Sequence, residues 1–494
     1  MSAPPCFFYA DEATRERLAR PGPRVLLVGG YGGFGNFGDV LQLKGALAWH
    51  RSAGEREPVV VCHACAIPDA GYCGRLRRWF GVREVLFWSP EALDLGVIGL
   101  ERVMGAAPIA HLHVYGGALL NRYWGATAVG IIEGLIEQFG AGHYVLSGQQ
   151  VDERFVSELR GHFERYRPVL AGGRDPESAR LLAECGVEAD DSFDDAIEMI
   201  ETWADRARNA LQEPFDLLVH LNLSYYTGES DLAELGGQLA RVAAHAGQWA
   251  GGRHPRVALL NAYSDRRADE VCDALGTVQQ LEDLFPFLRF EVFQLGQMAL
   301  EFAGSEPEAP MVPGAKLALA CSYHVSILCA RLGVPCYLSA RNAYYRQKRD
   351  GLGMAGDLDS FLRDPRAVSL EPRLAARRRW LHRMSDAYRL APSARAPAGP
   401  APVEGAPRPW VPKSRGAQLA SLQAELQKGA QAWREQQAYI GQLHEAKAWL
   451  EGQMNEWRRQ ALEGARAVEE LRAYVAQLEE AVRRAPTRGG GGAR

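Results

Sequence analysis

The sequence lacks long apolar runs, a strong net charge and a pattern of paired cysteines. None of its 494 residues belongs to an apolar run near the roughly 18 residues needed to cross a membrane, and the N-terminal segment has no signal-peptide core. The formal net charge of -4 gives no support for bulk nucleic-acid binding. We therefore expect a cytoplasmic protein with no membrane span and no nucleic-acid partner.

Nine cysteines are scattered along the chain, and their spacing does not resemble a disulfide framework. A metal site is suggested only by Cys62-His63-Ala64-Cys65 together with Cys73. No second such pair and no paired histidines occur at zinc-finger spacing, and the segment follows a valine run that is typical of a strand. The cysteines therefore predict reduced thiols and no metal site.

Short apolar runs alternate with helical stretches through most of the chain, which has room for about three domains. This alternation predicts two α/β domains with parallel, doubly wound sheets, at 1–205 and 213–388. Such sheets bind ligands at the carboxyl ends of their strands, often in a cleft between two domains. The expected strands are 24–30, 59–62, 85–87, 111–115, 144–146, 168–171, 215–220, 256–260, 289–293, 316–320 and 336–339.

Glycine and polar residues follow several of these strands. After the first strand, a glycine-rich loop carries Asn36, Gly38 and Asp39 into a helix over 40–50. Glycines let a backbone approach a ligand, and a helix start offers N–H donors, although a turn that serves only chain geometry is the competing interpretation. The loop is neither a P-loop nor a dinucleotide fingerprint. Later strands run into Gly116-Gly117 and into Gly172-Gly173-Arg174.

The stretch Cys321–Leu352 places Ser322, Tyr323 and His324 before a buried helix and a basic, aromatic loop after the following strand. A histidine at a helix start lies among unpaired N–H groups, which suit an anion. Basic side chains can add phosphate or carboxylate contacts. A polar helix start and a solvated loop remain the alternative. The loop contributes Arg341, Tyr345, Arg346 and Lys348.

Two charged segments have competing interpretations. The acidic stretch Asp190–Asp195 could hold paired catalytic carboxylates, but a helix cap is the favoured interpretation. The basic stretch Arg373–Arg379 could bind an anion, but a solvated helix face is favoured.

The C-terminal region differs in composition from the α/β region. A segment rich in Pro and Ala at 389–416 predicts a linker. From 417 to 484, apolar residues recur at alternating steps of three and four, which predicts a left-handed coiled coil and hence a homo-oligomer or a partner helix. The remaining 485–494 are expected to be disordered.

An ordered set of motifs resembles the polysaccharide pyruvyl transferase family. The motifs are Gly35-Asn36-Phe37-Gly38-Asp39, Gly116-Gly117, Arg174-Asp175 with Ser178, and His324 followed by Gly333-Val334-Pro335, Tyr345 and Lys348. The resemblance implies a GT-B-like fold and transfer of an enolpyruvyl group from phosphoenolpyruvate to hydroxyls of a cell-surface polysaccharide or its precursor, giving a pyruvate ketal. It implies phosphoenolpyruvate and a glycan as partners, and no cofactor.

The resemblance also implies roles for individual residues. His324 corresponds to the family's histidine at the donor site, Lys348 to its basic residue after the next strand, and Asn36 and Asp39 to its glycine-loop pair. We therefore predict catalytic roles for His324, Lys348 and Asp39, and substrate contacts for Asn36, Gly38, Gly116, Gly117, Arg174, Ser322, Tyr323, Arg341, Tyr345 and Arg346.

The sequence departs from the family at one position. The family usually has an arginine two residues before the histidine, where this chain has Ser322. Either another cation serves the donor (Arg174, Arg341 or Arg346), or the chain uses a different donor, or it has lost activity. The alternative functions are therefore a GT-B nucleotide-sugar glycosyltransferase and a catalytically silent polysaccharide-assembly scaffold.

Overall fold

The structure of the protein is a computed structural model. It describes residues 6–30, 35–54, 57–64, 67, 71–141, 143–209, 213–222, 232–248, 254–264, 282, 285–302 and 314–389, with isolated residues between 468 and 480. The chain divides into two compact units, 1–399 and 400–494. Among the described helices, none combines the length and apolar character that crossing a membrane requires.

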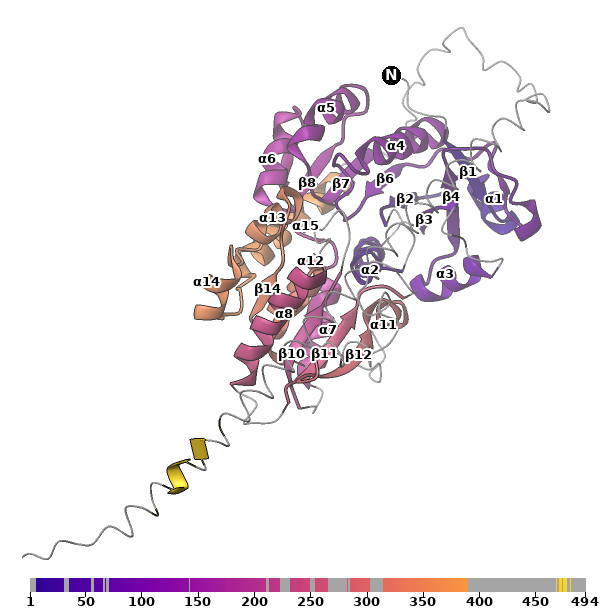
Figure 1. Cartoon of the computed structure of the whole chain (residues 1–494). Helices are drawn as coiled ribbons and strands as arrows, with labels where there is room; N and C mark the ends of the chain where they lie inside the picture. The colour runs from indigo at the N-terminus through magenta and orange to yellow at the C-terminus, as the bar shows by residue number, and fades with distance from the viewer. Residues whose placement is uncertain are drawn as a thin grey trace, which may run out of the picture. The chain divides into compact units, whose positions relative to one another are not determined.

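Nine of the described strands form one sheet in the order β5-β1-β4-β3-β2-β6-β7-β8-β9. β1 pairs antiparallel with both of its neighbours, β4 and β5, and the other described pairs are parallel (Figure 1). The strands are β1 (Phe7–Ala10), β2 (Arg24–Val28), β3 (Glu57–His63), β4 (Glu84–Ser89), β5 (Glu101–Arg102), β6 (His111–Val114), β7 (His143–Gln149), β8 (Leu170–Gly173) and β9 (Ala189–Asp191).

Helices cover both faces of this sheet, because successive strand residues point to opposite faces and both sets are apolar. Leu27 and Val60 pack with α2, α3 and α7, whereas Leu26 and Val61 pack with α4, α5 and α6. We call this sheet and its helices the first lobe. Its helices are α1 (Glu12–Leu18), α2 (Phe37–Ser52), α3 (Tyr72–Phe80), α4 (Gly125–Phe139), α5 (Val156–Arg165), α6 (Pro176–Glu184) and α7 (Ile197–Asn209).

Five further described strands form a parallel sheet in the order β12-β11-β10-β13-β14. We call this sheet and the helices α8, α11, α12, α13 and α14 the second lobe; one face packs on α8 and α14, and the other on α11 and α12. Its elements are β10 (Phe215–His220), α8 (Leu232–Gly247), β11 (Arg256–Asn261), β12 (Arg289–Gln294), α11 (Leu295–Glu301), β13 (Ala315–Ala320), α12 (Tyr323–Leu332), β14 (Cys336–Leu338), α13 (Ala343–Gly351) and α14 (Leu358–Arg363).

Each sheet reverses its strand order near its centre, and predicted ligand-binding segments follow the strands at that point. The reversal lies between β2 and β6 in the first sheet and between β10 and β13 in the second. The glycine-rich loop follows β2, Gly116-Gly117 follows β6, and His324 follows β13. Open α/β sheets bind ligands at such reversal points, so the topology directs both lobes' candidate residues to the ends of central strands.

The lobes are joined by backbone and side-chain hydrogen bonds. Phe37 N donates to the Ala262 carbonyl at 2.7 Å, and Ser264 N donates to the Gly35 carbonyl at 2.8 Å. Lys44 Nζ donates to three carbonyl groups at the end of α11, at 2.6 to 2.9 Å. Burial lowers the pKa of Lys44 to about 8, so at neutral pH it remains a cation suited to a helix C-terminus.

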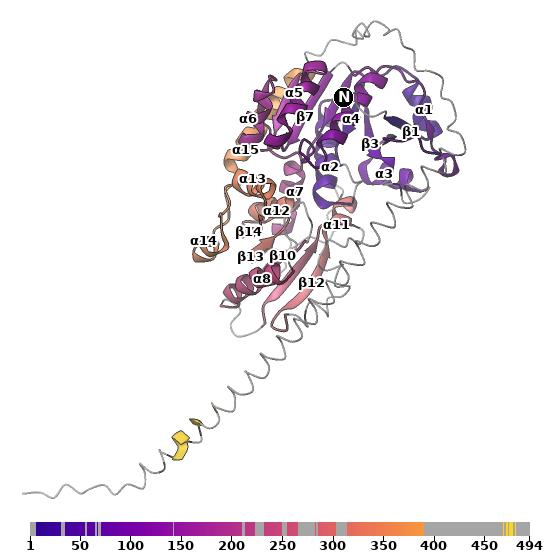
Figure 2. The same cartoon turned by 45° about the horizontal axis from the view of Figure 1, so that its top comes forward.

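The last helix of the compact unit, α15 (Glu371–Arg389), follows the second lobe in sequence but packs on the first. It lies against β8 and β9 of the first sheet (Figures 1 and 2). Trp380, fully buried, packs with Val145 and Leu170 of the first sheet. The boundary at 388 predicted for the second domain therefore includes a helix that belongs to the first lobe by packing.

The alternation of strands and helices predicted from the sequence is confirmed: the described residues form two largely parallel sheets, each covered on both faces. Three of the described strands were not predicted: β1 near the start of the chain, the two-residue β5, and β9, which overlaps the acidic stretch. The predicted coiled coil at 417–484, the linker beyond Arg389 and the tail at 485–494 lie outside the described residues, apart from isolated helical positions such as Val468 and Leu471.

Candidate functional site

His324 lies near the start of α12 and is bound to the first lobe by a buried carboxylate. Its Nε2 is 3.3 Å from Oδ2 of Asp194 and 3.1 Å from Nε2 of Gln42. Gln42 also donates to both oxygens of Asp194, at 3.2 and 3.1 Å. Asp194 and Gln42 are fully buried. The carboxylate therefore fixes the imidazole from the other lobe, as a carboxylate orients a catalytic histidine elsewhere.

The opposite edge of the imidazole lies on Gly38 in the first turn of α2. A Cβ atom at this position would be only 1.9 Å from Nδ1 of His324. Glycine is therefore required here for the close approach of two helices, one from each lobe. Asn36 forms the N-cap of α2, and its side chain accepts a hydrogen bond from Gly38 N at 2.8 Å.

Arg174 comes directly after β8 and is 2 % exposed. Its Nε is 2.9 Å from Oδ2 of Asp194, and the guanidinium lies 4.9 Å from the ring centroid of Tyr323. Burial alone would raise the pKa of Asp194, but Arg174 and His324 hold it well below its usual range. In the described part of the chain, Nη2 of Arg174 is buried with no hydrogen-bond partner. A buried donor without a partner is costly, so this atom indicates space for an acceptor from a ligand.

Lys348 lies on α13 between two tyrosine rings. Its Nζ is 4.1 Å from the ring centroid of Tyr344 and 4.3 Å from that of Tyr345. The residue is 7 % exposed, and no carboxylate within the described ranges forms an ion pair with it. Burial lowers the pKa of Lys348 well below its usual value, and the positive charge of Arg174 adds to this effect, while Asp194 and Asp39 oppose it.

Asp39, in the first turn of α2, adds a second carboxylate to the cluster. Burial raises its pKa, while His324, Arg174 and Lys348 act in the opposite direction and Asp194 adds to the increase. These mutual effects place Asp39 within electrostatic range of all four groups. The cluster thus combines two cations, two carboxylates and an imidazole from both lobes.

Other predicted site residues have local structural contacts. Ser322 is the N-cap of α12 and accepts a hydrogen bond from Val325 N at 3.5 Å. Gly116, with a φ of 48°, packs on Gln42, and Gly117 has a φ of 86°. Tyr345 is buried beside Lys348.

Arg341 and Arg346 are exposed, outside the cluster. Arg341 forms an ion pair with Glu234 of α8, and Arg346 donates to the carbonyl of Arg341 at 2.7 Å. Of the three arginines that could replace the cation missing at Ser322, the structure brings only Arg174 to His324.

Sequence reasoning missed the roles of Asp194 and Gln42 around His324. The helix-cap interpretation of the acidic stretch is partly correct, since Asp194 accepts a hydrogen bond from Ala196 N at 2.9 Å. The same carboxylate also reaches Arg174 and His324. Gln42 carries no signal in the sequence, because a glutamine in an apolar helix is common.

A buried hydrogen-bond chain lies behind the cluster. Asp195 accepts from Gly116 N and from Ser147 Oγ, both at 2.5 Å. Ser147 Oγ is 2.7 Å from Nε2 of His113, whose Nδ1 is 3.0 Å from Nε2 of His50. Burial lowers the pKa of His113 to about 4, Asp195 opposes this, and Arg377 adds to it.

His113 should make stability depend on pH in mildly acidic solution. A histidine in the unfolded chain titrates near 6.5, so between pH 6.5 and 4 the unfolded state binds more protons and stability falls as pH falls. The loss attributable to this residue is about 3 kcal/mol between pH 7 and pH 4. Urea unfolding of the wild type and of His113→Gln at pH 7 and pH 4 measures this effect. The free energy of unfolding should change less between the two pH values in the variant, by about that amount. An equal change in both proteins would show that His113 is not the source of the pH dependence.

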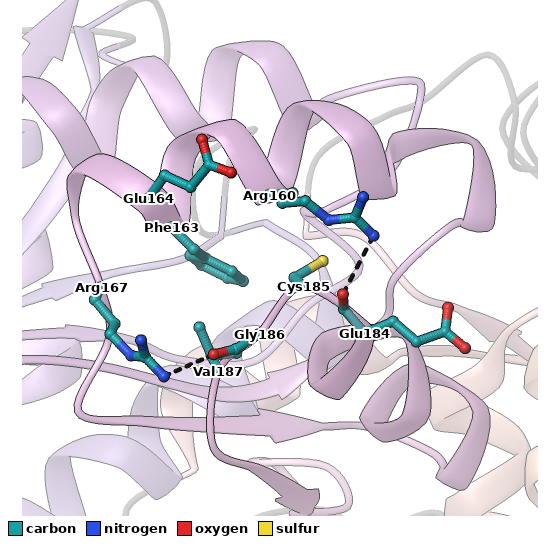
Figure 3. A pocket seen from close by; sticks show the side chains of 8 residues that line it. All are labelled: Arg160, Phe163, Glu164, Arg167, Glu184, Cys185, Gly186 and Val187. Atoms are coloured by element: carbon teal, nitrogen blue, oxygen red, sulfur yellow. Dashed lines mark hydrogen bonds between the residues drawn. The ribbon is translucent and has the colours of Figure 1, made fainter.

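A pocket of about 310 Å³ lies between α5 and the end of α6, apart from this cluster (Figure 3). Its two arginines are engaged with backbone carbonyls: Arg160 donates to Glu184 at 3.2 Å and Arg167 donates to Gly186 at 2.7 Å. None of the predicted site residues lines it.

Among the described residues, no group of three or more histidine, cysteine, aspartate or glutamate side chains could hold a metal ion. Cys62 and Cys73 are present as free thiols, and burial raises the pKa of both. Cys65, the remaining cysteine of the candidate metal motif, lies outside the described residues.

No protein-family model matches the sequence, and no curated protein matches it. Among solved structures, the chain is similar to sucrose-phosphate synthase from Thermosynechococcus elongatus, with 14% identity over 75% of this chain and 98% of that chain and a TM-score of 0.39. It is also similar to a putative UDP-N-acetylglucosamine 2-epimerase from Listeria monocytogenes, with 11% identity over 74% of this chain and 91% of that chain and a TM-score of 0.41.

A third similar structure is the UDP-GlcNAc 2-epimerase from Neisseria meningitidis, with 9% identity over 74% of this chain and 94% of that chain and a TM-score of 0.37. Likeness of this degree carries no argument about function. The two-lobed α/β fold of this chain is established by its own two sheets and their connections.

Proposed function

We propose that the protein is a ketal pyruvyl transferase, which moves an enolpyruvyl group from phosphoenolpyruvate to two hydroxyls of a cell-surface polysaccharide or its precursor. The observation that carries the proposal is a pair of buried cations beside His324: Arg174 with a buried Nη2 that lacks a partner, and Lys348 without a carboxylate in its ion-pair range among the described residues. Among the residues that the structure describes, Arg174 keeps a free donor nitrogen beyond its pair with Asp194, and Lys348 has no such pair, so the two groups favour a ligand with more than one negative group.

Phosphoenolpyruvate meets this requirement because it carries a phosphate and a carboxylate. In the proposed complex Arg174 and Lys348 bind these groups, and the first turn of α12 offers backbone N–H donors. Arg174 then supplies the cation that the pyruvyl transferase family usually has two residues before the histidine. Ser322 at that position caps the helix instead.

His324 is suited to proton transfer at this donor. Asp194 holds the ring on one side and Gly38 contacts it on the other, while the side chain remains 12 % exposed. In the overall reaction, both acceptor oxygens bond to C2 of the enolpyruvyl unit, a proton adds to its methylene carbon, and inorganic phosphate leaves. The two hydroxyl protons balance the new methyl C–H bond and the phosphate. Proton transfer by a positioned imidazole fits the general acid or base role.

The test is incubation of the full chain with phosphoenolpyruvate and a panel of glycans, with inorganic phosphate and pyruvylated glycan measured together. Phosphate release matched by ketal formation supports the proposal. Release of nucleotide from a sugar-nucleotide donor, with none from phosphoenolpyruvate, would instead support a glycosyltransferase. Binding of neither donor in calorimetry would support a catalytically silent scaffold.

We also propose that residues 417–484 mediate self-association, on the strength of their heptad pattern alone. A chain that ends at residue 412 should have a lower assembly mass than the full chain, measured by light scattering, while its thermal unfolding stays unchanged. An equal number of chains per assembly in both samples would contradict self-association through this segment.

A further inference from the structure

Helix α15 holds the acidic stretch that supplies Asp194. The acidic stretch contains four aspartates, and three of them form ion pairs with arginines of α15. The pairs are Arg383 with Asp190 at 2.9 Å, Arg373 with Asp191, and Arg377 with Asp195 at 2.6 Å. Asp194 alone contacts Arg174 and His324. From the sequence, a solvated face was the favoured interpretation of the basic helix. In the structure three of its arginines instead form ion pairs with the loop next to the cluster.

The pair formed by Arg377 and Asp195 is the most enclosed of these contacts. Arg377 is 4 % exposed and Asp195 is 1 % exposed. Arg377 also bonds to Glu198 of α7 at 2.7 Å and to the Ser192 carbonyl at 3.3 Å. Asp195 accepts hydrogen bonds from the ends of β6 and β7, through Gly116 and Ser147. This carboxylate is thus fixed from α15 on one side and from the first sheet on the other.

The backbone between these carboxylates is strained. Phe193 has a φ of 54°, although it is a fully buried phenylalanine. A bulky residue in the left-handed region persists only where the surrounding structure enforces it. Arg373 lies 4.9 Å from the Phe193 ring centroid and forms a further hydrogen bond to the carbonyl of Arg174. The contacts from α15 thus enclose the turn that directs Asp194 toward His324.

We propose that Arg377, acting through Asp195, is a positioning residue for Asp194 and hence for His324. Asp194 and Asp195 are consecutive, so a shift of Asp195 moves the carboxylate that holds the imidazole. Arg383 provides a matched comparison, because it lies on the same helix, carries the same charge and pairs with Asp190 and Glu188 at the outer part of the stretch.

The test measures the ring signals of His324 by NMR in the free protein at pH 7, with its signal among the 12 histidines identified by its loss in His324→Gln. Arg377→Met should move the signal toward its position in Asp194→Asn, and Arg383→Met should leave it in place. A folded Arg377→Met protein with the wild-type signal would overturn the proposal. If Arg377→Met does not fold, the nearly isosteric Asp195→Asn variant replaces it. Its His324 signal should also move toward the position in Asp194→Asn, and a wild-type signal would overturn the proposal.

A kinetic readout follows if the proposed function holds. Arg377→Met should lower kcat roughly 10- to 100-fold with little change in KM for phosphoenolpyruvate, because misplacement of a catalytic group affects the chemical step. Arg377→Lys should recover part of the loss. The NMR result does not depend on the reaction, so it separates failure of the positioning role from failure of the proposed function.

Discussion

Replacing His324 with alanine is expected to lower kcat of pyruvyl transfer by roughly 10²- to 10⁴-fold, the contribution typical of a positioned general acid or base. The imidazole lies between Asp194 and Gly38, so its loss removes the group that exchanges protons without removing the buried cations. Binding of phosphoenolpyruvate, measured by calorimetry, should change much less than kcat.

The matched control is His382→Ala, because His382 is exposed on α15 and takes no part in the cluster. This variant should keep wild-type kcat and stability. A His324→Ala enzyme with more than a tenth of wild-type kcat would exclude His324 as the catalytic acid or base, even if the protein proved to be a pyruvyl transferase.

Replacing Lys348 with methionine is expected to weaken phosphoenolpyruvate binding roughly 10- to 100-fold, since a hydrogen bond to a charged group contributes about 1.5–3 kcal/mol. Methionine keeps an unbranched side chain between Tyr344 and Tyr345, so the packing of α13 should survive. Calorimetric titration of the free protein with phosphoenolpyruvate measures the effect.

The pH dependence of binding provides a second measurement on the same variant. Burial lowers the pKa of Lys348 well below its usual value, so the amine loses its charge at a lower pH than an exposed lysine. Phosphoenolpyruvate binding to the wild-type protein should therefore weaken as pH rises through that pKa. In Lys348→Met this weakening should be absent.

Arg366→Met serves as the control for charge removal, because Arg366 is an exposed arginine of the second lobe that pairs with Asp364. Its phosphoenolpyruvate affinity should equal that of the wild type. Equal affinity in Lys348→Met and the wild type would show that Lys348 is not part of the donor site and would leave Arg174 as its principal cation.

The buried ion pair between Arg174 and Asp194 makes removal of Arg174 a poor first experiment. Arg174 is the partner of Asp194, which is fully buried. Without the guanidinium, an unpaired carboxylate would remain in the interior, and loss of a buried partner costs several kcal/mol. An Arg174 variant would therefore lose stability, and this loss would obscure any effect on donor binding.

Local sequence patterns determined the elements and several of the candidate residues. The apolar run Arg24–Val28 and the glycine loop after it predicted a strand, a turn and a helix, because these depend on neighbours within a few residues. The same reasoning placed His324 at a helix start and Lys348 after the next strand. β9 was missed because its three residues include two aspartates, and pairing with β8 overrides their poor strand propensity.

The sequence alone determined that the chain alternates strands and helices, that glycine loops follow several strands and that an imidazole begins a buried helix. Only the tertiary structure decided which charges meet: Asp194 and Arg174 join His324, Arg341 turns to Glu234, and α15 returns to the first lobe. The physical reason is that secondary structure follows from local periodicity, whereas the choice of an ion-pair partner depends on distances between segments far apart in sequence and on their burial.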